Sequence, residues 1–230
     1  MTRLLASVTD CPEAETAIAA GADIIDLKDP SRGALGALPL DAIRSIVQQV
    51  AGRRPVSATI GDLPSDPALM TDAIRATAAT GVDYVKAGFF TMEGLSDCLD
   101  TIASLTRDSA VVAVLFADRS PPLDDLSGFA RAGFAGVMLD TADKARGNLT
   151  AHANPAELRR FVDQARSLGL LSGLAGALRI DDIPALLPLA PDYLGFRGAL
   201  CARAKRHNGM DPDRLGAIRR AIPASPSSAA

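Results

Sequence analysis

The chain of 230 residues contains no tryptophan, two histidines, three cysteines and only four lysines among its 24 basic residues. Cys11, Cys98 and Cys201 are odd in number and far apart, which suits neither a disulfide framework nor a zinc site. His152 and His207 are equally isolated, so they lack the spacing of a metal-binding pair. We therefore expect no metal site.

Long apolar runs and an excess of positive charge are also missing. Hydrophobic residues make up 48% of the chain, charged residues 22%, and the formal net charge is -3, a balance typical of soluble globular enzymes. The first fifteen residues reach acidic positions too early for a signal peptide, and no apolar run is long enough to span a membrane. We expect a cytoplasmic protein that binds neither nucleic acid nor membrane.

Eight short apolar runs alternate with amphipathic stretches of helical spacing. In one of these stretches Asn154 is a predicted N-cap, Pro155 and Glu157 fill the first turn, and Gly169 ends the helix. The predicted strands are residues 4–8, 23–28, 56–60, 83–88, 111–116, 136–141, 170–175 and 192–197.

This alternation predicts an α/β fold, a single-domain (β/α)₈ TIM barrel over residues 1–222, with a Pro- and Ser-rich disordered tail at 223–230. A weak internal repeat supports it, because GADIIDLK, GVDYVKAG, GFAGVMLD and PDYLGFR share one plan: a small residue, often an aspartate, then apolar residues that enter a strand. No glycine-rich dinucleotide motif follows the first strand, and no nucleotide-binding P-loop motif occurs.

Alternation along each strand predicts which side chains enter the barrel, whose catalytic residues come from the carboxyl ends of the strands. Asp26, Lys28, Lys86, Asp140 and Arg197 fall on the inner face because their apolar neighbours face the helices. The same count places Ser57, Thr59, Tyr84 and Met138 inside. The predicted mouth therefore holds amines and carboxylates together.

Lysine is informative here because a crowded or desolvated lysine loses its proton and becomes a nucleophile or a base, whereas arginine stays charged. Lys28 and Lys86 are the candidates, with Asp26 as a partner that orients Lys28. Lys144, in the long segment after the sixth strand, could meet Asp140 over the mouth if that loop closes. The alternative is that these groups form only a buried ion network, or in the case of Lys144 a solvated charge.

Phosphate binding has a separate signal in the loops after the seventh and eighth strands, which read AGAL (175–178) and RGAL (197–200). Such loops bind phosphate through backbone amides in many barrels, and glycine lets the backbone approach an anion. The segment 203–209 is basic and could serve a second phosphate or be a solvated loop. The predicted substrate- and phosphate-binding residues are Ser7, Thr59, Gly176, Ala177, Arg197, Gly198 and Ala199.

Together these motifs resemble the (5-formylfuran-3-yl)methyl phosphate synthases of methanofuran biosynthesis, also called 4-(hydroxymethyl)-2-furancarboxaldehyde-phosphate synthases. The resemblance runs from residue 4 to about 209, and departs in the compact loop FADRSPPLDD, in the Arg- and Ala-rich composition and in the tail. It is carried by GADIIDLKDP, GALGA, PVSATIGD, DYVKAGFF, VMLDTADK, LAGAL and GFRGALC.

The resemblance implies a cofactor-independent carbon–oxygen lyase that condenses two molecules of glyceraldehyde 3-phosphate, one of them reacting as dihydroxyacetone phosphate. It implies that Lys28 forms the Schiff base and that Lys86 is the proton acceptor. Asp26, Asp140 and Lys144 match further polar positions of the active site. An iminium on Lys28 supplies the electron sink, so no cofactor is expected.

Two alternatives use the same residues. A Schiff-base aldolase or transaldolase acting on related sugar phosphates would need the same lysine and barrel. A non-catalytic sugar-phosphate sensor would need only the phosphate loops, since barrels host many functions. We also expect a homo-oligomer, although no feature of the sequence fixes its symmetry, and the sequence assigns no role to Lys205.

Overall fold

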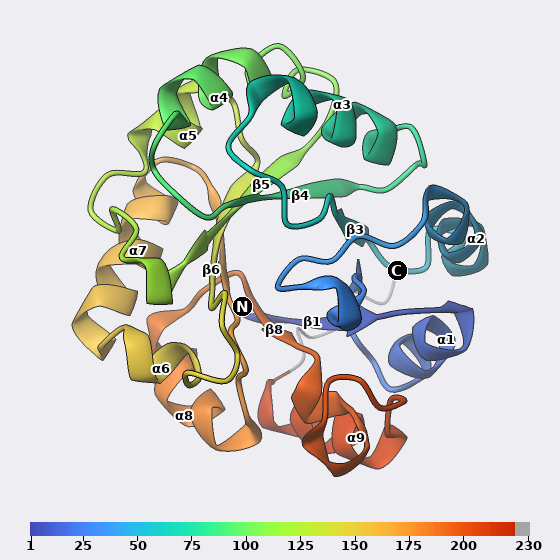
Figure 1. Ribbon diagram of the computed structural model, residues 1–230. Coiled ribbons are helices and arrows are strands. Elements are labelled where there is room, and N and C mark those ends of the chain that lie inside the picture. The colour runs from blue at the N-terminus through green and yellow to red at the C-terminus, as the bar shows by residue number, and fades with distance from the viewer. Residues whose placement is uncertain (224–230) are drawn as a thin grey trace, which may run out of the picture.

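The computed structural model describes residues 1–223, and eight parallel strands close into one barrel in the order β1 to β8 (Figure 1). All eight predicted strands are confirmed, with ends that differ by at most one residue. The predicted tail lies outside the described residues, except for Pro223. The strands are β1 Arg3–Val8, β2 Ile24–Leu27, β3 Val56–Thr59, β4 Tyr84–Phe89, β5 Val111–Phe116, β6 Gly136–Asp140, β7 Leu171–Leu174 and β8 Tyr193–Phe196.

Helices surround the barrel on its outer side (Figure 1). The α-helices are α1 Cys11–Ala19, α2 Leu40–Val50, α3 Pro67–Ala78, α4 Leu95–Ile102, α5 Ser127–Arg131, α6 Leu149–His152, α7 Pro155–Ser167, α8 Ile183–Leu186 and α9 Pro212–Ala221. Short 3₁₀ helices are η1 Pro30–Arg32, η2 Ala117–Arg119, η3 Ile180–Asp182, η4 Leu187–Leu189, η5 Gly198–Leu200 and η6 Ala202–Ala204. The TIM-barrel prediction is therefore confirmed.

Capping side chains fix the start of helix α7, which the sequence predicts after residue 154. The Asn154 side chain accepts from the backbone N–H groups of Ala156 and Glu157, and the Glu157 carboxylate accepts from the N–H of Asn154. This capping box satisfies donors at the start of α7 that have no partner inside the helix. The sequence suggested a long loop before this helix, but residues 149–152 of that segment form the short helix α6.

Two apolar layers flank the barrel wall. Ile25, Leu27 and Val85 pack in the larger outer core between strands and helices. Phe116 and Met138 belong to the smaller cluster inside the barrel. The alternation predicted from the sequence is confirmed, and it leaves the carboxyl ends of the strands free to carry polar groups inward.

A repeated aspartate ties neighbouring strands together at the opposite end of the barrel. The backbone N–H of Asp23 donates to the carbonyl of Leu4 (2.9 Å), and the N–H of Leu4 donates to the Asp23 carboxylate (2.7 Å). The same two bonds join Asp83 to Val56, and Asp192 to Ser172. In the strands β2, β4 and β8 the repeat in the sequence therefore marks the residue before the strand, where a carboxylate can accept a backbone hydrogen bond from the preceding strand.

Candidate active site

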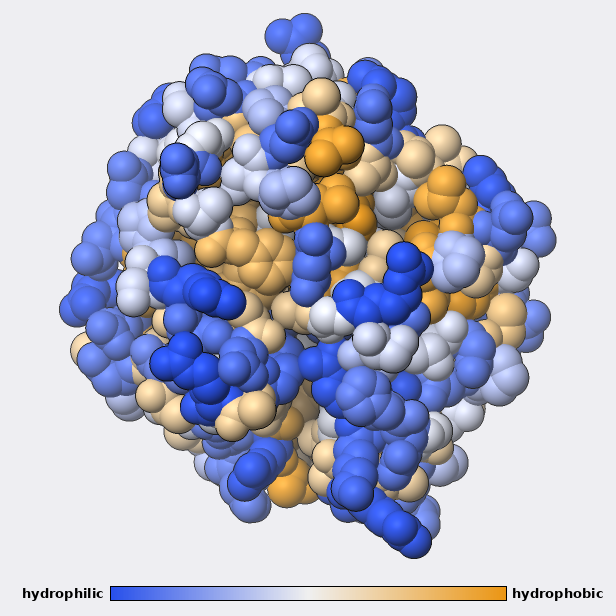
Figure 2. Space-filling view, viewed as in Figure 1, coloured by the Kyte–Doolittle hydropathy of each residue, from blue (hydrophilic) through white to orange (hydrophobic). Residues whose placement is uncertain are grey.

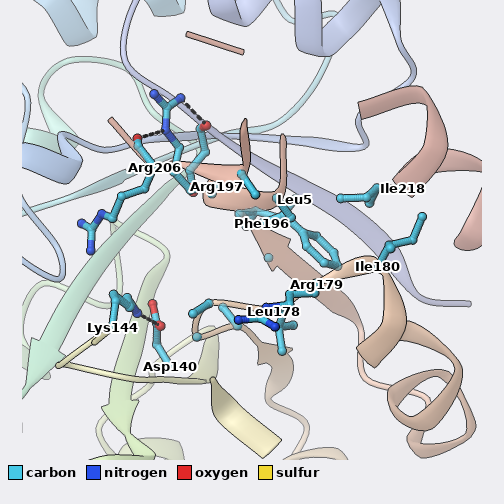
Figure 3. Close-up of a pocket in the computed structure, with 18 of the residues that line it drawn as sticks. Leu5, Asp140, Lys144, Leu178, Arg179, Ile180, Phe196, Arg197, Arg206 and Ile218 are labelled. Atoms are coloured by element: carbon cyan, nitrogen blue, oxygen red, sulfur yellow. Dashed lines mark hydrogen bonds and ion pairs between the residues drawn. The ribbon is translucent and has the colours of Figure 1, made fainter. Parts of the chain in front are cut away.

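A cavity of about 590 Å³ opens at the carboxyl ends of the strands, where the centre of this face is hollowed (Figure 2). Its lining comes from the ends of strands β1, β2, β6, β7 and β8 and from the loops that follow them (Figure 3). The predicted site residues that line it are Ser7, Asp26, Lys28, Asp140, Lys144, Gly176, Ala177, Arg197, Gly198 and Ala199.

Asp26 is the centre of a buried hydrogen-bond network at the bottom of this cavity. Its carboxylate accepts from the Ser7 hydroxyl (2.8 Å), the Ser57 hydroxyl (2.6 Å) and the Lys86 ammonium (2.9 Å). Burial by itself would raise the pKa of Asp26, but Lys86 and Lys28 outweigh that effect and lower the pKa below its ordinary value. Asp26 therefore carries a negative charge that is fully satisfied by hydrogen bonds.

Asp140, at the end of β6, forms a second ion-pair group on the other side of the cavity. Its carboxylate lies 3.7 Å from the Lys28 ammonium and accepts from the Lys144 ammonium and from the N–H of Thr141 (2.7 Å) (Figure 3). Burial opposes its charge, but Lys144 and Lys28 hold its pKa well below the ordinary range. The predicted meeting of Asp140 with Lys144 is thus present in the structure.

The Lys28 amine has a strongly lowered pKa. Burial lowers its pKa to about 8; Asp140 and Asp26 act in the opposite direction, while Lys144 and Lys86 add to the lowering. At pH 7 about one tenth of such an amine is neutral, against less than about one thousandth for an ordinary lysine. Lys28 therefore has an amine that can act as a nucleophile, and it lines the cavity.

If the Schiff base that the sequence resemblance implies forms on Lys28, its rate of formation should rise with pH and level off above about 8. Replacing Lys144 with glutamine removes a positive neighbour and leaves Asp140 to Lys28 alone, so the Lys28 pKa should rise and the profile should shift to higher pH. Borohydride trapping of dihydroxyacetone phosphate, followed by mass spectrometry, measures this profile. Arg146→Gln, an exposed change in the same loop, is the control; an unshifted profile in Lys144→Gln would contradict the coupling.

Lys86 differs from the other two amines because it lies behind Asp26. Its exposed fraction is 1%, and Asp26 rather than Lys86 lines the cavity. The Asp26 carboxylate therefore lies between the Lys86 ammonium and the cavity. The sequence placed Lys86 inside the barrel correctly, but the order of the two groups follows only from the structure.

The two glycine-containing loops lie side by side along the cavity. Gly176 has φ +109°, and a Cβ at this position would lie 3.0 Å from the backbone nitrogen of Thr141, so both conformation and contact require glycine. Among the described residues, no acceptor is bound by the backbone N–H groups of Gly176, Ala177, Gly198 and Ala199. These amides are available to an anionic ligand.

The side chain of Arg197, one of the predicted substrate- or phosphate-binding residues, is engaged with other groups of the protein. Its guanidinium donates to the Glu13 carboxylate and to the backbone carbonyls of Ser7, Arg206 and Asn208, with five hydrogen bonds in all. A guanidinium has five N–H donors, so none is left for a phosphate. The side chain instead fixes the segment after β8.

The hydroxyl of Thr59 is likewise occupied. It is completely buried, donates to the carbonyl of Gly36 (3.1 Å) and does not line the cavity. Thr59 therefore supports the loop after β2 from below. Ser7, in contrast, reaches the cavity and orients Asp26.

Two positioning carboxylates were missed from the sequence. Asp118 accepts from the N–H groups of Ala142 (2.7 Å) and Asp143 (2.9 Å) and so holds the loop that carries Lys144. Asp62 accepts from two backbone N–H groups in the loop after β2, at residues 34 and 35. The signal available was their position two residues beyond a predicted strand.

Metal-binding clusters and membrane-spanning helices are both absent from the described residues. Residues 1–223 contain no cluster of three or more histidine, cysteine or acidic side chains arranged to hold a metal ion. Within the same residues, no helix has the length and apolar character needed to cross a membrane.

The chain is similar to several known proteins. A family model described as 4-HFC-P synthase matches residues 4–219. A Methylorubrum extorquens protein, named provisionally as a (5-formylfuran-3-yl)methyl phosphate synthase, is 44% identical over 224 residues, which cover 97% of this chain and 93% of that protein. The (5-formylfuran-3-yl)methyl phosphate synthase of Methanopyrus kandleri is 38% identical over 219 residues, with 90% and 92% coverage.

Solved structures with the same architecture are more distant in sequence. Phosphoribosylanthranilate isomerase of Thermotoga maritima superposes with a TM-score of 0.67 at 12% identity, covering 96% of this chain and 98% of that one. A 3-hexulose-6-phosphate synthase gives 0.60 at 17% identity, with 94% and 99% coverage. At these identities the likeness establishes the barrel fold alone.

Proposed function

The chain belongs to the 4-HFC-P synthase family, and from that membership we propose that it is the carbon–oxygen lyase that forms (5-formylfuran-3-yl)methyl phosphate in methanofuran biosynthesis. The substrates are two molecules of glyceraldehyde 3-phosphate, one of which reacts as dihydroxyacetone phosphate, and phosphate and water are lost. The observation that carries the proposal is the Lys28 amine, whose pKa is lowered to about 8 beside the Asp140 carboxylate in the cavity.

Covalent attachment is the first step of the proposed reaction. The neutral Lys28 amine attacks the ketone carbon of dihydroxyacetone phosphate, and loss of water gives a positively charged iminium. Asp140, 3.7 Å from the Lys28 nitrogen, stabilises that charge. Lys144, hydrogen-bonded to Asp140, lies close enough to supply the proton that the departing oxygen needs.

Carbon–carbon bond formation follows through an enamine. The iminium acidifies the neighbouring C–H bond, and the proton passes to the Lys86 and Asp26 pair at the bottom of the cavity. The enamine carbon then attacks the aldehyde of the second triose phosphate. Elimination of phosphate and water, closure of the ring and cleavage of the C–N bond that releases the Lys28 amine give the aromatic furan, and aromaticity makes these last steps effectively irreversible.

The amides of the two glycine loops suit the phosphate of the first triose. Gly176 and Gly198 lie beyond β7 and β8 on the same cavity wall, and their free N–H groups offer neutral donors that approach closely. A phosphate held there places a three-carbon chain within the cavity that Lys28 lines.

Product analysis tests this function directly. Incubation with glyceraldehyde 3-phosphate and dihydroxyacetone phosphate should give a product with near-ultraviolet absorbance and the mass of the furan aldehyde phosphate, together with inorganic phosphate. With glyceraldehyde 3-phosphate alone, turnover indicates that the enzyme also isomerises the triose. An aldol adduct without furan absorbance would support the aldolase alternative, and binding without any turnover would support the sensor.

A further inference from the structure

Residues 202–209, which we call the strap, form a folded segment beside the cavity. The N–H of Ala202 donates to the carbonyl of Gly209 (3.0 Å), and the Asn208 side chain donates to the carbonyl of Ala202 (2.7 Å). An isolated antiparallel bridge between Cys201 and Met210 closes its base. The strap is therefore an internally bonded loop, not an open tail of the barrel.

A buried ion pair fixes the strap to the barrel wall. Arg197 donates to the carbonyl of Arg206 (3.0 Å) (Figure 3). It also pairs with Glu13 and donates to the carbonyl of Asn208 (3.3 Å). Glu13 accepts in turn from the N–H of Met210 (3.1 Å). The backbone that carries the Arg206 side chain is thus positioned by groups that are themselves buried.

Arg206 extends from the strap to the loop after β2. One of its nitrogens donates to the carbonyl of Gly33 (2.7 Å), and the residue is half-buried in the cavity wall. Among the described residues, its other N–H groups have no acceptor and its charge has no carboxylate partner within an ion-pair distance. In contrast, Asp26 and Asp140 are each paired with lysines.

The position of Arg206 separates it from the loop after β7. In Figure 3 Arg206 lies on the side of the cavity that also holds Lys144, whereas Arg179 and Ile180 lie on the opposite side. A desolvated guanidinium with unused donors is well suited to a phosphate, which it binds through two parallel hydrogen bonds. The reaction proposed above brings two phosphorylated molecules into one cavity.

We propose that Arg206 binds the phosphate of the second triose phosphate, so that the cavity has two anion positions on opposite sides of Lys28. This inference rests on the proposed function for the identity of the second substrate. Arg206 is then the residue that makes the enzyme choose a phosphorylated aldehyde over an unphosphorylated one.

Binding stoichiometry tests the second position without any chemistry. Glycerol 3-phosphate has no carbonyl and cannot react with Lys28, so equilibrium dialysis should show two molecules bound per wild-type chain and one per Arg206→Gln chain. Lys205→Gln removes a positive charge from an exposed neighbour in the strap and should still bind two. One molecule per wild-type chain, or two in Arg206→Gln, would overturn the inference.

Aldehyde selectivity provides a second measurement that a purely structural role would not change. With dihydroxyacetone phosphate as partner, the ratio of kcat/KM for glyceraldehyde 3-phosphate to that for glyceraldehyde should fall roughly 10- to 100-fold in Arg206→Gln. Arg206→Lys should recover part of the ratio, and Lys205→Gln should leave it unchanged. A general loss of stability lowers both rates together, so an unchanged ratio in Arg206→Gln contradicts the assignment.

The two hypotheses fail in different ways. If the wild-type enzyme makes no furan aldehyde, the proposed function is wrong, and the stoichiometry with glycerol 3-phosphate still decides whether Arg206 holds a second anion. If furan is made but Arg206→Gln keeps the wild-type selectivity, only the role of Arg206 is wrong.

Discussion

Replacing Lys28 with arginine should lower kcat by about 10⁴-fold or more and abolish borohydride trapping of dihydroxyacetone phosphate. Arginine keeps the positive charge that faces Asp140, so an ion pair can still form where the Lys28 nitrogen now lies 3.7 Å from the Asp140 carboxylate. What it removes is the ability to become a neutral nucleophile. The measurement is furan formation together with the mass of the trapped protein.

Stability provides the control for this substitution. Lys28 is 6% exposed, so the larger guanidinium has to be accommodated at the mouth, and thermal unfolding shows whether the fold tolerates it. Lys205→Arg, in the exposed strap, is the matched change and should retain wild-type turnover. Substantial furan formation by folded Lys28→Arg would rule out the Schiff base on this residue.

Replacing Lys86 with methionine should have two large effects. Loss of Lys86 from the pair with Asp26 that takes the substrate proton should reduce kcat by about 10²- to 10⁴-fold. Because the Asp26 carboxylate is completely buried, removal of its ammonium partner should also lower the free energy of unfolding by about 3–5 kcal/mol. Denaturant unfolding and steady-state kinetics measure the two effects separately.

The double variant Lys86→Met with Asp26→Asn separates catalysis from stability. An amide at position 26 is uncharged and can still hydrogen-bond with the hydroxyls of Ser7 and Ser57, so most of the lost stability should return. Activity should stay low, because neither a base nor its carboxylate partner remains. Recovery of turnover along with stability would show that the pair is only structural.

The strands and the inward-facing charges could be predicted from the sequence because both follow from short-range patterns. A buried parallel strand is a short apolar run, and its side chains alternate with a period of two. Once Ile25 and Leu27 are placed outside, Asp26 and Lys28 must lie inside. The lysine count added the chemistry, since it directed attention to the few positions where an amine is present.

Partners formed across loops could not be predicted in the same way. The pairing of Arg197 with Glu13 joins residues 184 positions apart, and it depends on how the strap folds back. The hydrogen bonds from the N–H groups of residues 142 and 143 to Asp118 depend on the path of a loop. The local sequence pattern does not specify that path. An arginine beside one of the glycine-containing loops therefore looks like a ligand until its partners are seen.

The paired aspartate hydrogen bonds at the base of the barrel also determine where a circular permutation can open the chain at low cost. Each bond joins consecutive strands, β1 to β2, β3 to β4 and β7 to β8, through residues that lie close in sequence. A circular permutation opened between β2 and β3 leaves each bonded pair local in the chain. Opened between β3 and β4 instead, it would turn the short closure between Val56 and Asp83 into one that spans nearly the whole chain, at a higher entropic cost.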